Sequence, residues 1–142
     1  MFVLPVTSNV LLIPQTIIAS KYPQMKILKD TRLRERFLGK LQGLPIPDDW
    51  DDTNYHESTE SMPELYERAK DFISHLQSSC QNRTVLVVSH GITLKVLISI
   101  CLGYDESQLN KMDDLANCST CIFEKTPTEF LLVTSVKPPL KY

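Results

Sequence analysis

Glycine is scarce in this chain, and the few glycines that occur exclude two common nucleotide-binding motifs. Gly39, Gly43, Gly91 and Gly103 are the only four, and their spacing allows neither a Walker A loop nor a Gly-x-Gly-x-x-Gly turn. No apolar run approaches the roughly 20 residues that a membrane-spanning helix needs. The apolar stretch over residues 1–13 has no basic segment before it and is interrupted by proline, so we expect no signal peptide.

Neither sign of charge dominates the sequence. The 15 Lys and Arg residues are balanced by 17 Asp and Glu residues, which leaves a formal net charge of −2. This balance creates no basic field for nucleic acid, and we expect neither a nucleic acid nor a membrane as partner. With 42% hydrophobic residues the chain is expected to fold rather than to be disordered. A length of 142 residues is typical of one domain, so residues 1–142 are treated as one.

Cysteines are few and offer no obvious metal site. Three of the four residues Cys80, Cys101, Cys118 and Cys121 stand in apolar surroundings. We expect these three to be small core residues, which favours a reducing, cytoplasmic location. The Cys118-x-x-Cys121 pair leads into an expected strand, whereas redox pairs open a helix. Because no second Cys or His pair could complete a zinc site, we expect a structural role for this pair and no metal.

The clearest local signals predict two helices. Ser61-x-x-Glu64 is a capping box, and apolar residues follow it at helical spacing, which predicts a helix from Met62 to about Ser79. The segment Ile92–Leu102 is apolar nearly all round and precedes a glycine, which predicts a buried helix with that glycine at its end.

The remaining elements alternate with these helices, which predicts an α/β fold of about three layers. They are a helix from Ser8 to about Lys21 disturbed by Pro14, a strand over Met25–Leu28, a surface loop over Leu44–Glu60, a strand over Val85–Val88 buried on both faces, and a terminal hairpin of Cys121–Phe123 with Phe130–Ser135.

His90 is the first candidate for chemistry. It follows the apolar run Val85–Val88 and precedes Gly91 and a helix, so it is expected at the carboxyl edge of the sheet. Ligands of open α/β sheets bind at that edge, and free N–H groups at a helix N-terminus suit a phosphate. The alternative is a histidine that merely ends a strand–helix turn, and the spacing alone favours neither.

Glu35 is the second candidate, since it is one carboxylate among the four basic residues of the segment 30–40. Neighbouring arginines lower the pKa of a carboxyl, so Glu35 could donate a proton only beside a bound phosphate dianion that offsets their charge. The alternative is a solvated charged loop, which is the commoner origin of such a run.

Taken together, four blocks in order resemble the histidine phosphatase (phosphoglycerate mutase-like) superfamily. The resemblance extends from about Phe2 to Val136, and the residue sequence of Arg32–Arg36 resembles that of the TIGAR-like fructose-2,6-bisphosphatase branch. The blocks are Ser8–Val10 with Gln15–Thr16, Leu33–Gly43, Glu60–Ser61 ahead of Arg68 with Thr59 in place of a glycine, and Ser89–Gly91.

The resemblance implies a three-layer α/β/α phosphoglycerate mutase-like fold with a mostly parallel sheet and a phosphoryl-transfer site without cofactor or metal. Glu35 matches the residue that protonates the leaving oxygen and then activates water, and His90 matches the second histidine, which stabilises the phosphoryl oxygens. Gly91 and Ile92 would offer backbone groups near the substrate, and Arg36 a phosphate contact. The implied substrate is a small phosphorylated metabolite, with fructose-2,6-bisphosphate as the best single choice.

The nucleophile of that family is not matched. The chain has no Arg-His-Gly motif, Leu12 takes the place of a further arginine, and the other histidines, His56 and His75, lie in different contexts. The family's first strand, which lies beside the strand before His90, is also unmatched, so the domain is expected to be incomplete and the chain N-terminally truncated. We therefore expect weak activity or none, because loss of a nucleophile removes most of the rate enhancement.

Three interpretations remain open at this stage. The chain could be a weak phosphatase, or a non-catalytic relative that binds a phosphorylated ligand or a protein partner through Glu35, Arg36 and His90. It could also be a shortened product without independent function. Ligand binding without turnover would favour the second interpretation, and failure to fold as a monomer the third.

Overall fold

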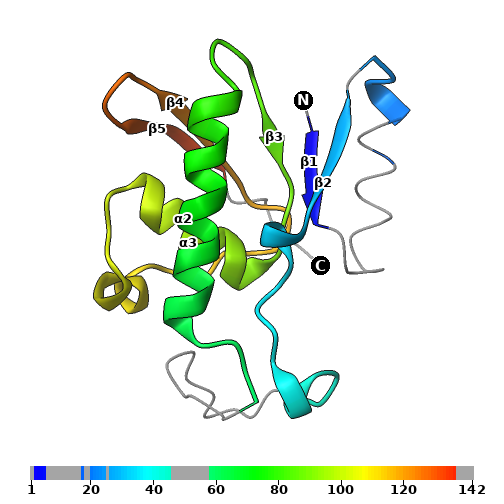
Figure 1. Ribbon diagram of the computed structural model, residues 1–142, viewed down its shortest axis with the longest axis vertical. Helices are drawn as coiled ribbons and strands as arrows, with labels where there is room; N and C mark the ends of the chain where they lie inside the picture. The colour runs from blue at the N-terminus through cyan, green and yellow to red at the C-terminus, as the bar shows by residue number, and fades with distance from the viewer. Residues whose placement is uncertain (1, 6–16, 18–19, 25, 46–57, 137–142) are drawn as a thin grey trace.

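The computed structural model describes residues 2–5, 17, 20–24, 26–45 and 58–136. These residues form a small parallel sheet, two α-helices beside it and a separate hairpin (Figure 1). The predicted mixture of helices and strands is confirmed. Most of the helix predicted from Ser8 to about Lys21 lies outside the described residues.

The sheet has three strands in the order β2-β1-β3. The central strand β1 (Phe2–Pro5) pairs in parallel with β2 (Ile27–Asp30) on one side and with β3 (Leu86–Val87) on the other. Parallel pairing was expected, but β1 was not predicted as a strand, because a short apolar run that ends in a proline is a weak signal. The expectation that no strand lies beside the strand before His90 was wrong, because β1 pairs with β3 there. The strand predicted over Met25–Leu28 begins and ends two residues later than expected.

The strand before His90 differs from its prediction. We expected Val85–Val88 to be a strand buried on both faces, but β3 covers only two residues and Leu86 is 37% exposed. The physical reason is its position, since β3 pairs with β1 and is the outer strand among those that the structure describes. An outer strand pairs along one edge only, which explains why β3 extends only over the two residues that pair with β1.

Helix α2 (Met62–Ser79) has the predicted bounds. Its capping box is formed, because the backbone N–H of Ser61 donates to Glu64 Oε2 at 2.8 Å and the backbone N–H of Glu64 donates to Ser61 Oγ at 3.4 Å. Two N–H groups that the helix leaves unpaired are thereby satisfied. The prediction is confirmed because this helix start depends on local contacts alone.

Helix α3 (Gly91–Cys101) packs against α2 and is buried along most of its length, as predicted. At its end Gly103 adopts a φ of +74°, a conformation that glycine reaches without strain. The N–H of Gly103 donates to Ile100 O at 3.0 Å and that of Tyr104 to Ser99 O at 2.9 Å, which is a Schellman motif.

The core lies between the two helices and the turn that follows β2. Partly buried residues of the strand region, among them Val85 and Val87, pack against it. The buried hydrophobic residues are Leu33, Met62, Leu65, Tyr66, Ala69, Phe72, Val96, Leu97 and Leu109. Leu33 belongs to the 3-10 turn η2 (Thr31–Leu33) and Leu109 to η4 (Glu106–Lys111), so both connections are anchored to the helices.

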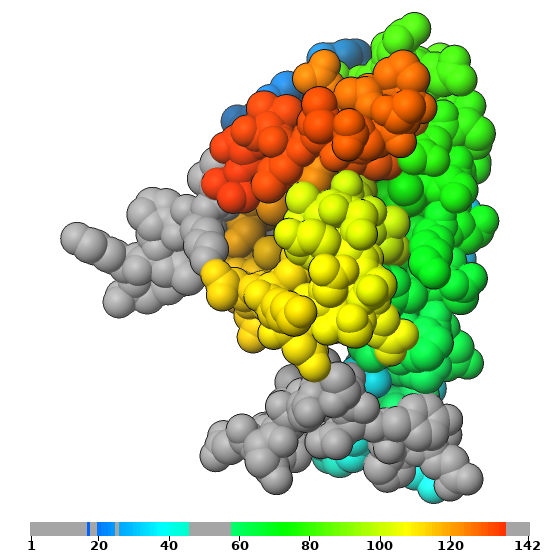
Figure 2. Space-filling view, turned by 90° about the vertical axis from the view of Figure 1, so that its left-hand side faces the viewer, coloured from blue at the N-terminus to red at the C-terminus, as the bar shows by residue number. Residues whose placement is uncertain are grey.

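The terminal hairpin consists of β4 (Thr120–Lys125) and β5 (Phe130–Val136), paired antiparallel as predicted. Figure 2 shows it as the orange and red surface above the yellow connection that contains η4. Leu131, Leu132 and Val133 of β5 are 45%, 45% and 59% exposed, so this strand presents apolar side chains at the surface.

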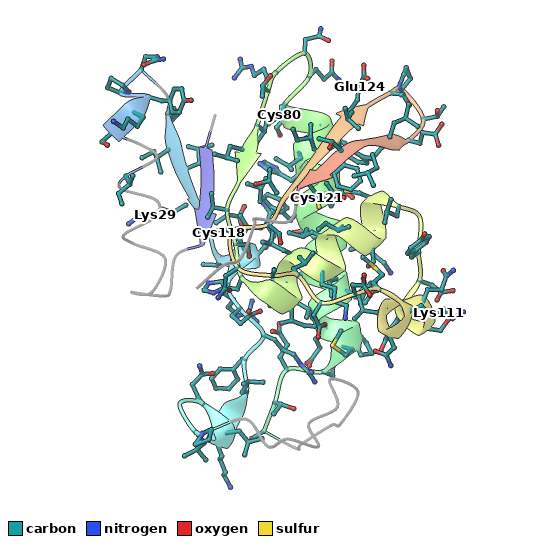
Figure 3. The ribbon with its side chains drawn as sticks, turned by 180° about the vertical axis from the view of Figure 1, so that it is seen from behind. Lys29, Cys80, Lys111, Cys118, Cys121 and Glu124 are labelled. Atoms are coloured by element: carbon teal, nitrogen blue, oxygen red, sulfur yellow. The ribbon has the colours of Figure 1, made fainter. Side chains whose placement is uncertain are left out.

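The cysteines are less buried than expected. Cys118 is exposed, the other three are partly buried, and all four are free thiols. Figure 3 shows Cys118 and Cys121 at the start of the hairpin, away from Cys80 at the end of α2. Burial raises the pKa of the Cys101 thiol to about 12.

The predicted surface loop Leu44–Glu60 is described only in part, since residues 46–57 lie outside the described ranges. Its end is not at the surface, because Thr59 is 6% and Glu60 8% exposed. Before this loop, the turn η3 (Gly39–Leu41) meets Ser58, whose Oγ accepts from the backbone N–H of Lys40 at 3.1 Å. Among the residues described, no helix has the length and apolar character to cross a membrane.

Candidate functional site

The segment that carries Glu35 is first fixed at its N-terminal side, where β2 ends. Asp30 caps η2, because its Oδ1 accepts from the backbone N–H of Arg32 at 2.9 Å. The Arg32 guanidinium pairs with Asp30 at 2.7 Å and with Asp71 of α2 at 2.8 Å, and it lies 5.5 Å above the Phe72 ring. The Arg32 side-chain hydrogen bond is the main reason why the pKa of Asp30 lies below its ordinary value.

A buried carboxylate holds the same segment from the other side. Glu60, whose side chain is 6% exposed, accepts at Oε1 from Arg34 Nη2 and Arg68 Nε, both at 2.6 Å. Its Oε2 accepts from Arg68 Nη2 at 2.9 Å and from the backbone N–H of Phe37 at 3.2 Å. The sequence linked Glu60 and Arg68 to a family motif. That Glu60 pairs with Arg68 and also with Arg34, beside Glu35, is visible only in the structure.

Charge and burial oppose each other at Glu60. Burial by itself would raise the pKa of this carboxyl, but the hydrogen bonds and positive charge of Arg68, the Phe37 N–H and the charge of Arg34 outweigh burial. The pKa of Glu60 therefore lies below its ordinary value, and the carboxylate is ionised at neutral pH. Arg68 also donates from Nη1 to Arg32 O and from Nη2 to Glu35 O, the latter at 3.4 Å.

Arg36, predicted as a phosphate contact, lies in the protein interior. Its residue is 3% exposed, and its Nε donates to the backbone carbonyl of Glu60 at 2.8 Å. This placement ties the residue after Glu35 to the start of α2. Four basic residues in this segment suggested a solvated loop, whereas three of them, Arg32, Arg34 and Arg36, hold the segment in place.

Glu35 meets the first turn of α3. Its Oε1 accepts from the backbone N–H of Arg36 at 2.9 Å, from the backbone N–H of Thr93 at 3.2 Å and from Thr93 Oγ1 at 3.1 Å. His90, the N-cap residue, makes no side-chain capping hydrogen bond, so the Glu35 carboxylate caps this helix from another segment. A negative charge at a helix N-terminus is also favoured by the helix dipole.

Sequence reasoning missed Thr93, which is fully buried. Its hydroxyl lies 2.8 Å from Arg34 O as well as near Glu35, so it bridges the helix and the segment before it. Ser89 acts similarly, with Oγ donating to Leu33 O at 2.7 Å. The available signal was a hydroxyl residue at the third position of the helix that follows His90.

His90 lies at the N-terminus of α3, partly buried, next to Glu35. Burial lowers the pKa of its imidazole below the ordinary value, the Glu35 carboxylate acts in the opposite direction, and Arg68 adds to the lowering. His90 is therefore neutral at pH 7. The structure thus brings together the two side chains that the sequence singled out, although 54 residues separate them along the chain.

The backbone of the first turn supplies donors at the same place. Gly91 is exposed and Ile92 partly so, and within the described part of the chain no residue accepts from their N–H groups. Free N–H groups of this kind, with the helix dipole, favour an anion. The substrate contact that the resemblance implies for both residues stays a prediction.

The other histidines do not join this cluster in the described structure. His75 lies on α2, where its Nδ1 is 3.5 Å from Ser79 Oγ, and His56 falls outside the described residues. Across the ranges that the structure describes, no group of three or more His, Cys, Asp and Glu residues could hold a metal ion.

The comparisons define the family. The model of the Histidine phosphatase superfamily (branch 1) matches residues 6–137, and the chain belongs to this superfamily. No curated protein matches the chain with significance. Its fold is the mixed α/β fold of phosphoglycerate mutase-like proteins.

Several solved structures share this fold. YhfR of Bacillus stearothermophilus superposes with a TM-score of 0.76 at 24% identity, over 92% of this chain and 71% of that chain. The complex of mycobacterial glucosyl-3-phosphoglycerate phosphatase Rv2419c with inorganic phosphate has a TM-score of 0.78 at 19% identity, over 94% and 75%. The product of open reading frame Rv3214 of Mycobacterium tuberculosis has a TM-score of 0.72 at 18% identity, over 94% and 70%.

Acid is expected to unfold the protein through Asp30 and Glu60. Both carboxyls have folded-state pKa values below their ordinary 3.8 and 4.5, so the unfolded chain takes up protons first as the pH falls. Their contribution is complete above about pH 4.5 and is lost as the pH falls through the folded-state values. Thermal melts from pH 6 to pH 2.5 measure this loss. Glu60→Gln should flatten the profile, whereas the exposed control Glu67→Gln should leave its slope unchanged.

Proposed function

We propose that this chain binds a phosphorylated small molecule at the N-terminus of α3, and that it hydrolyses phosphate esters weakly or not at all. The observation that carries the proposal is the meeting of Glu35 with the first turn of α3 beside His90. Membership of the histidine phosphatase superfamily and the phosphate complex of a structural relative support the ligand class.

Each site residue has a defined role in this proposal. The N–H groups of Gly91 and Ile92 and the imidazole of His90 bind the phosphate oxygens, since donors and a helix N-terminus stabilise the dianion. Glu35 lies where it could exchange a proton with the ester or with water. Arg36 contributes positive charge from the interior, held by the Glu60 carbonyl.

The expected lack of turnover depends on the nucleophile. Enzymes of this family act through a phosphohistidine, and the sequence matches Arg-His-Gly nowhere. His90 takes the place of the second histidine, so the attacking group of that mechanism has no counterpart. Binding without rapid hydrolysis is therefore the function that these residues support best.

The finer identity of the ligand and the location are also proposals. The resemblance of the segment Arg32–Arg36 to the TIGAR-like fructose-2,6-bisphosphatase branch supports fructose-2,6-bisphosphate as the first ligand to test. The four free thiols support a reducing compartment such as the cytoplasm. The second candidate function is binding of a protein partner through Glu35, Arg36 and His90. In a pull-down experiment with this chain, phosphate should then abolish capture of the partner.

Calorimetry and a phosphate-release assay on the same folded chain test the proposal. We expect saturable binding of fructose-2,6-bisphosphate or a phosphoglycerate, with phosphate release far below that of a complete family enzyme. His90→Ala should weaken binding roughly 10- to 100-fold, as expected for loss of a hydrogen bond to a charged group. His75→Ala, on the exposed face of α2, is the matched control and should bind as the parent does.

Two outcomes would contradict the proposal. Rapid phosphate release that Glu35→Ala and His90→Ala both abolish would mean that another group acts as nucleophile. No binding of any phosphorylated ligand by a chain with a cooperative unfolding transition would refute the ligand class.

A further inference from the structure

The two oxygens of the Glu35 carboxylate have different surroundings. Oε1 accepts all three hydrogen bonds, from the backbone N–H of Arg36 and from the N–H and hydroxyl of Thr93. Oε2 accepts no hydrogen bond from the part of the chain that the structure describes. One oxygen is thus committed to the protein, and the other is left for a ligand.

We propose that Thr93 is a positioning residue that holds Oε1 of Glu35, so that Oε2 is the oxygen that exchanges a proton with the bound phosphate compound. This inference rests on the proposed function and names the atom through which that site acts. A proton placed on Oε1 would point at two backbone N–H donors and at a Thr93 hydroxyl whose one proton Oε1 shares with Arg34 O, whereas a proton on Oε2 meets none of them.

The proton balance follows from this geometry. When Glu35 is protonated, the Oε2–H bond donates to a phosphate or ester oxygen, and transfer breaks that bond while forming an O–H bond on the ligand. When Glu35 is ionised, Oε2 accepts the proton of a ligand hydroxyl, so an Oε2–H bond forms, the ligand O–H bond breaks and the negative charge moves to the ligand oxygen. Oε1 keeps its protein hydrogen bonds in both states.

Thr93 is the donor that determines the direction of the carboxylate. The Arg36 N–H belongs to the next residue and moves with Glu35, but Thr93 belongs to α3 and is 0% exposed. It therefore ties Glu35 to the helix that begins after His90. A residue that only filled space could be replaced by valine, which has the same shape without the hydroxyl.

The His90 imidazole reports the position of Glu35 without any need for activity. Its pKa is measured by NMR titration of the ring protons in the full chain. The charged groups that act on it are the Glu35 carboxylate and the Arg68 guanidinium. Glu35→Gln should lower the pKa of His90, and the size of that decrease measures the coupling between the two side chains.

Thr93→Val should reduce this coupling by about half, because the carboxylate loses the hydroxyl donor, keeps only the two backbone N–H donors and becomes more mobile and hydrated. Thr93→Ser keeps the hydroxyl and should restore the parent coupling. In the Glu35→Gln background, Thr93→Val should leave the pKa of His90 unchanged, since its effect passes through Glu35. Should Thr93→Val not fold, Thr93→Ala removes the hydroxyl without a clash and takes its place.

Inorganic phosphate probes the free oxygen. The amide introduced by Glu35→Gln has one acceptor oxygen and an NH₂ group with two N–H donors, so the two backbone N–H groups should select its oxygen and turn its NH₂ group to the position of Oε2. At pH 8 this variant should bind phosphate more tightly than the parent, as a fixed imitation of the protonated acid. Adding Thr93→Val should weaken that binding roughly 3- to 10-fold, the effect of one hydrogen bond.

Ser99→Ala is the control, because it removes another buried hydroxyl of α3 that contacts Tyr66 and not Glu35. It should change neither the His90 titration nor phosphate binding. The proposal is overturned if Thr93→Val keeps the full coupling, if Thr93→Ser behaves as Thr93→Val, or if Thr93→Val shifts the pKa of His90 equally in the Glu35→Gln background. If no variant binds phosphate, the proposed function fails, while the His90 titration still decides the role of Thr93.

Discussion

Replacing Glu60 with alanine is expected to lower the free energy of unfolding by about 3 kcal/mol, since breaking a buried ion pair leaves an uncompensated charge. Arg68, whose side chain is only 11% exposed, would lose its partner, and the Phe37 N–H would lose its acceptor. For a domain of this size the loss corresponds to a decrease in Tm of roughly 10 °C. Urea unfolding followed by circular dichroism measures it directly.

The neighbouring surface provides the control for Glu60. Glu67 lies on the same helix with its side chain 74% exposed and pairs with Lys70, so Glu67→Ala should cost less than about 0.5 kcal/mol. Removing both partners of the buried pair, with Glu60→Ala and Arg68→Met together, should cost less than the sum of the single changes. Strict additivity would show that the two side chains do not stabilise the segment as a pair.

Phe72→Ala is expected to have an effect at least as large. Phe72 is 1% exposed at the centre of the core, and removing a buried phenyl ring costs about 3–5 kcal/mol in lost transfer energy and cavity formation. The change also removes the ring beneath the Arg32 guanidinium. Because small domains are stable by only about 5–15 kcal/mol, the variant should melt far earlier than the parent or be unfolded at 37 °C.

Phe37 is the matched phenylalanine for this experiment. It is 52% exposed, and it contacts Glu60 through its backbone N–H and carbonyl, which alanine keeps, so Phe37→Ala should change the free energy of unfolding by less than about 1 kcal/mol. Similar losses for the two variants would mean that the core is not centred on α2. Differential scanning calorimetry of the three proteins makes the comparison.

Glu60 and Phe72 support the candidate site although neither side chain touches the ligand position. Glu60 holds the backbone on both sides of Glu35, and Phe72 supports Arg32 at the start of the same segment. The candidate site therefore depends on helix α2, although the groups that would bind phosphate lie on α3 and on the segment after β2.

Local sequence signals predicted those helices and strands whose ends depend on contacts between residues close in the sequence. The capping box at Ser61 defined the start of α2, Gly103 defined the end of α3, and two short apolar runs on either side of a turn defined the hairpin. Such features depend on contacts within a few residues, so one chain suffices to recognise them. The short strand β1 was missed, because it becomes a strand only by pairing with β2 and β3, and the bounds predicted for those two strands differ from the observed ones.

By itself the sequence determined the family and the main helices and named Glu35 and His90 as candidates, because motif spacing and helical periodicity are written along the chain. The tertiary structure decided the rest. It placed Arg36 in the interior, made Glu60 the centre of an ion cluster and brought Thr93 against Glu35 across 58 positions. The physical reason is that hydrogen bonds and ion pairs act over a few ångströms in space, whereas a sequence records only separation along the chain.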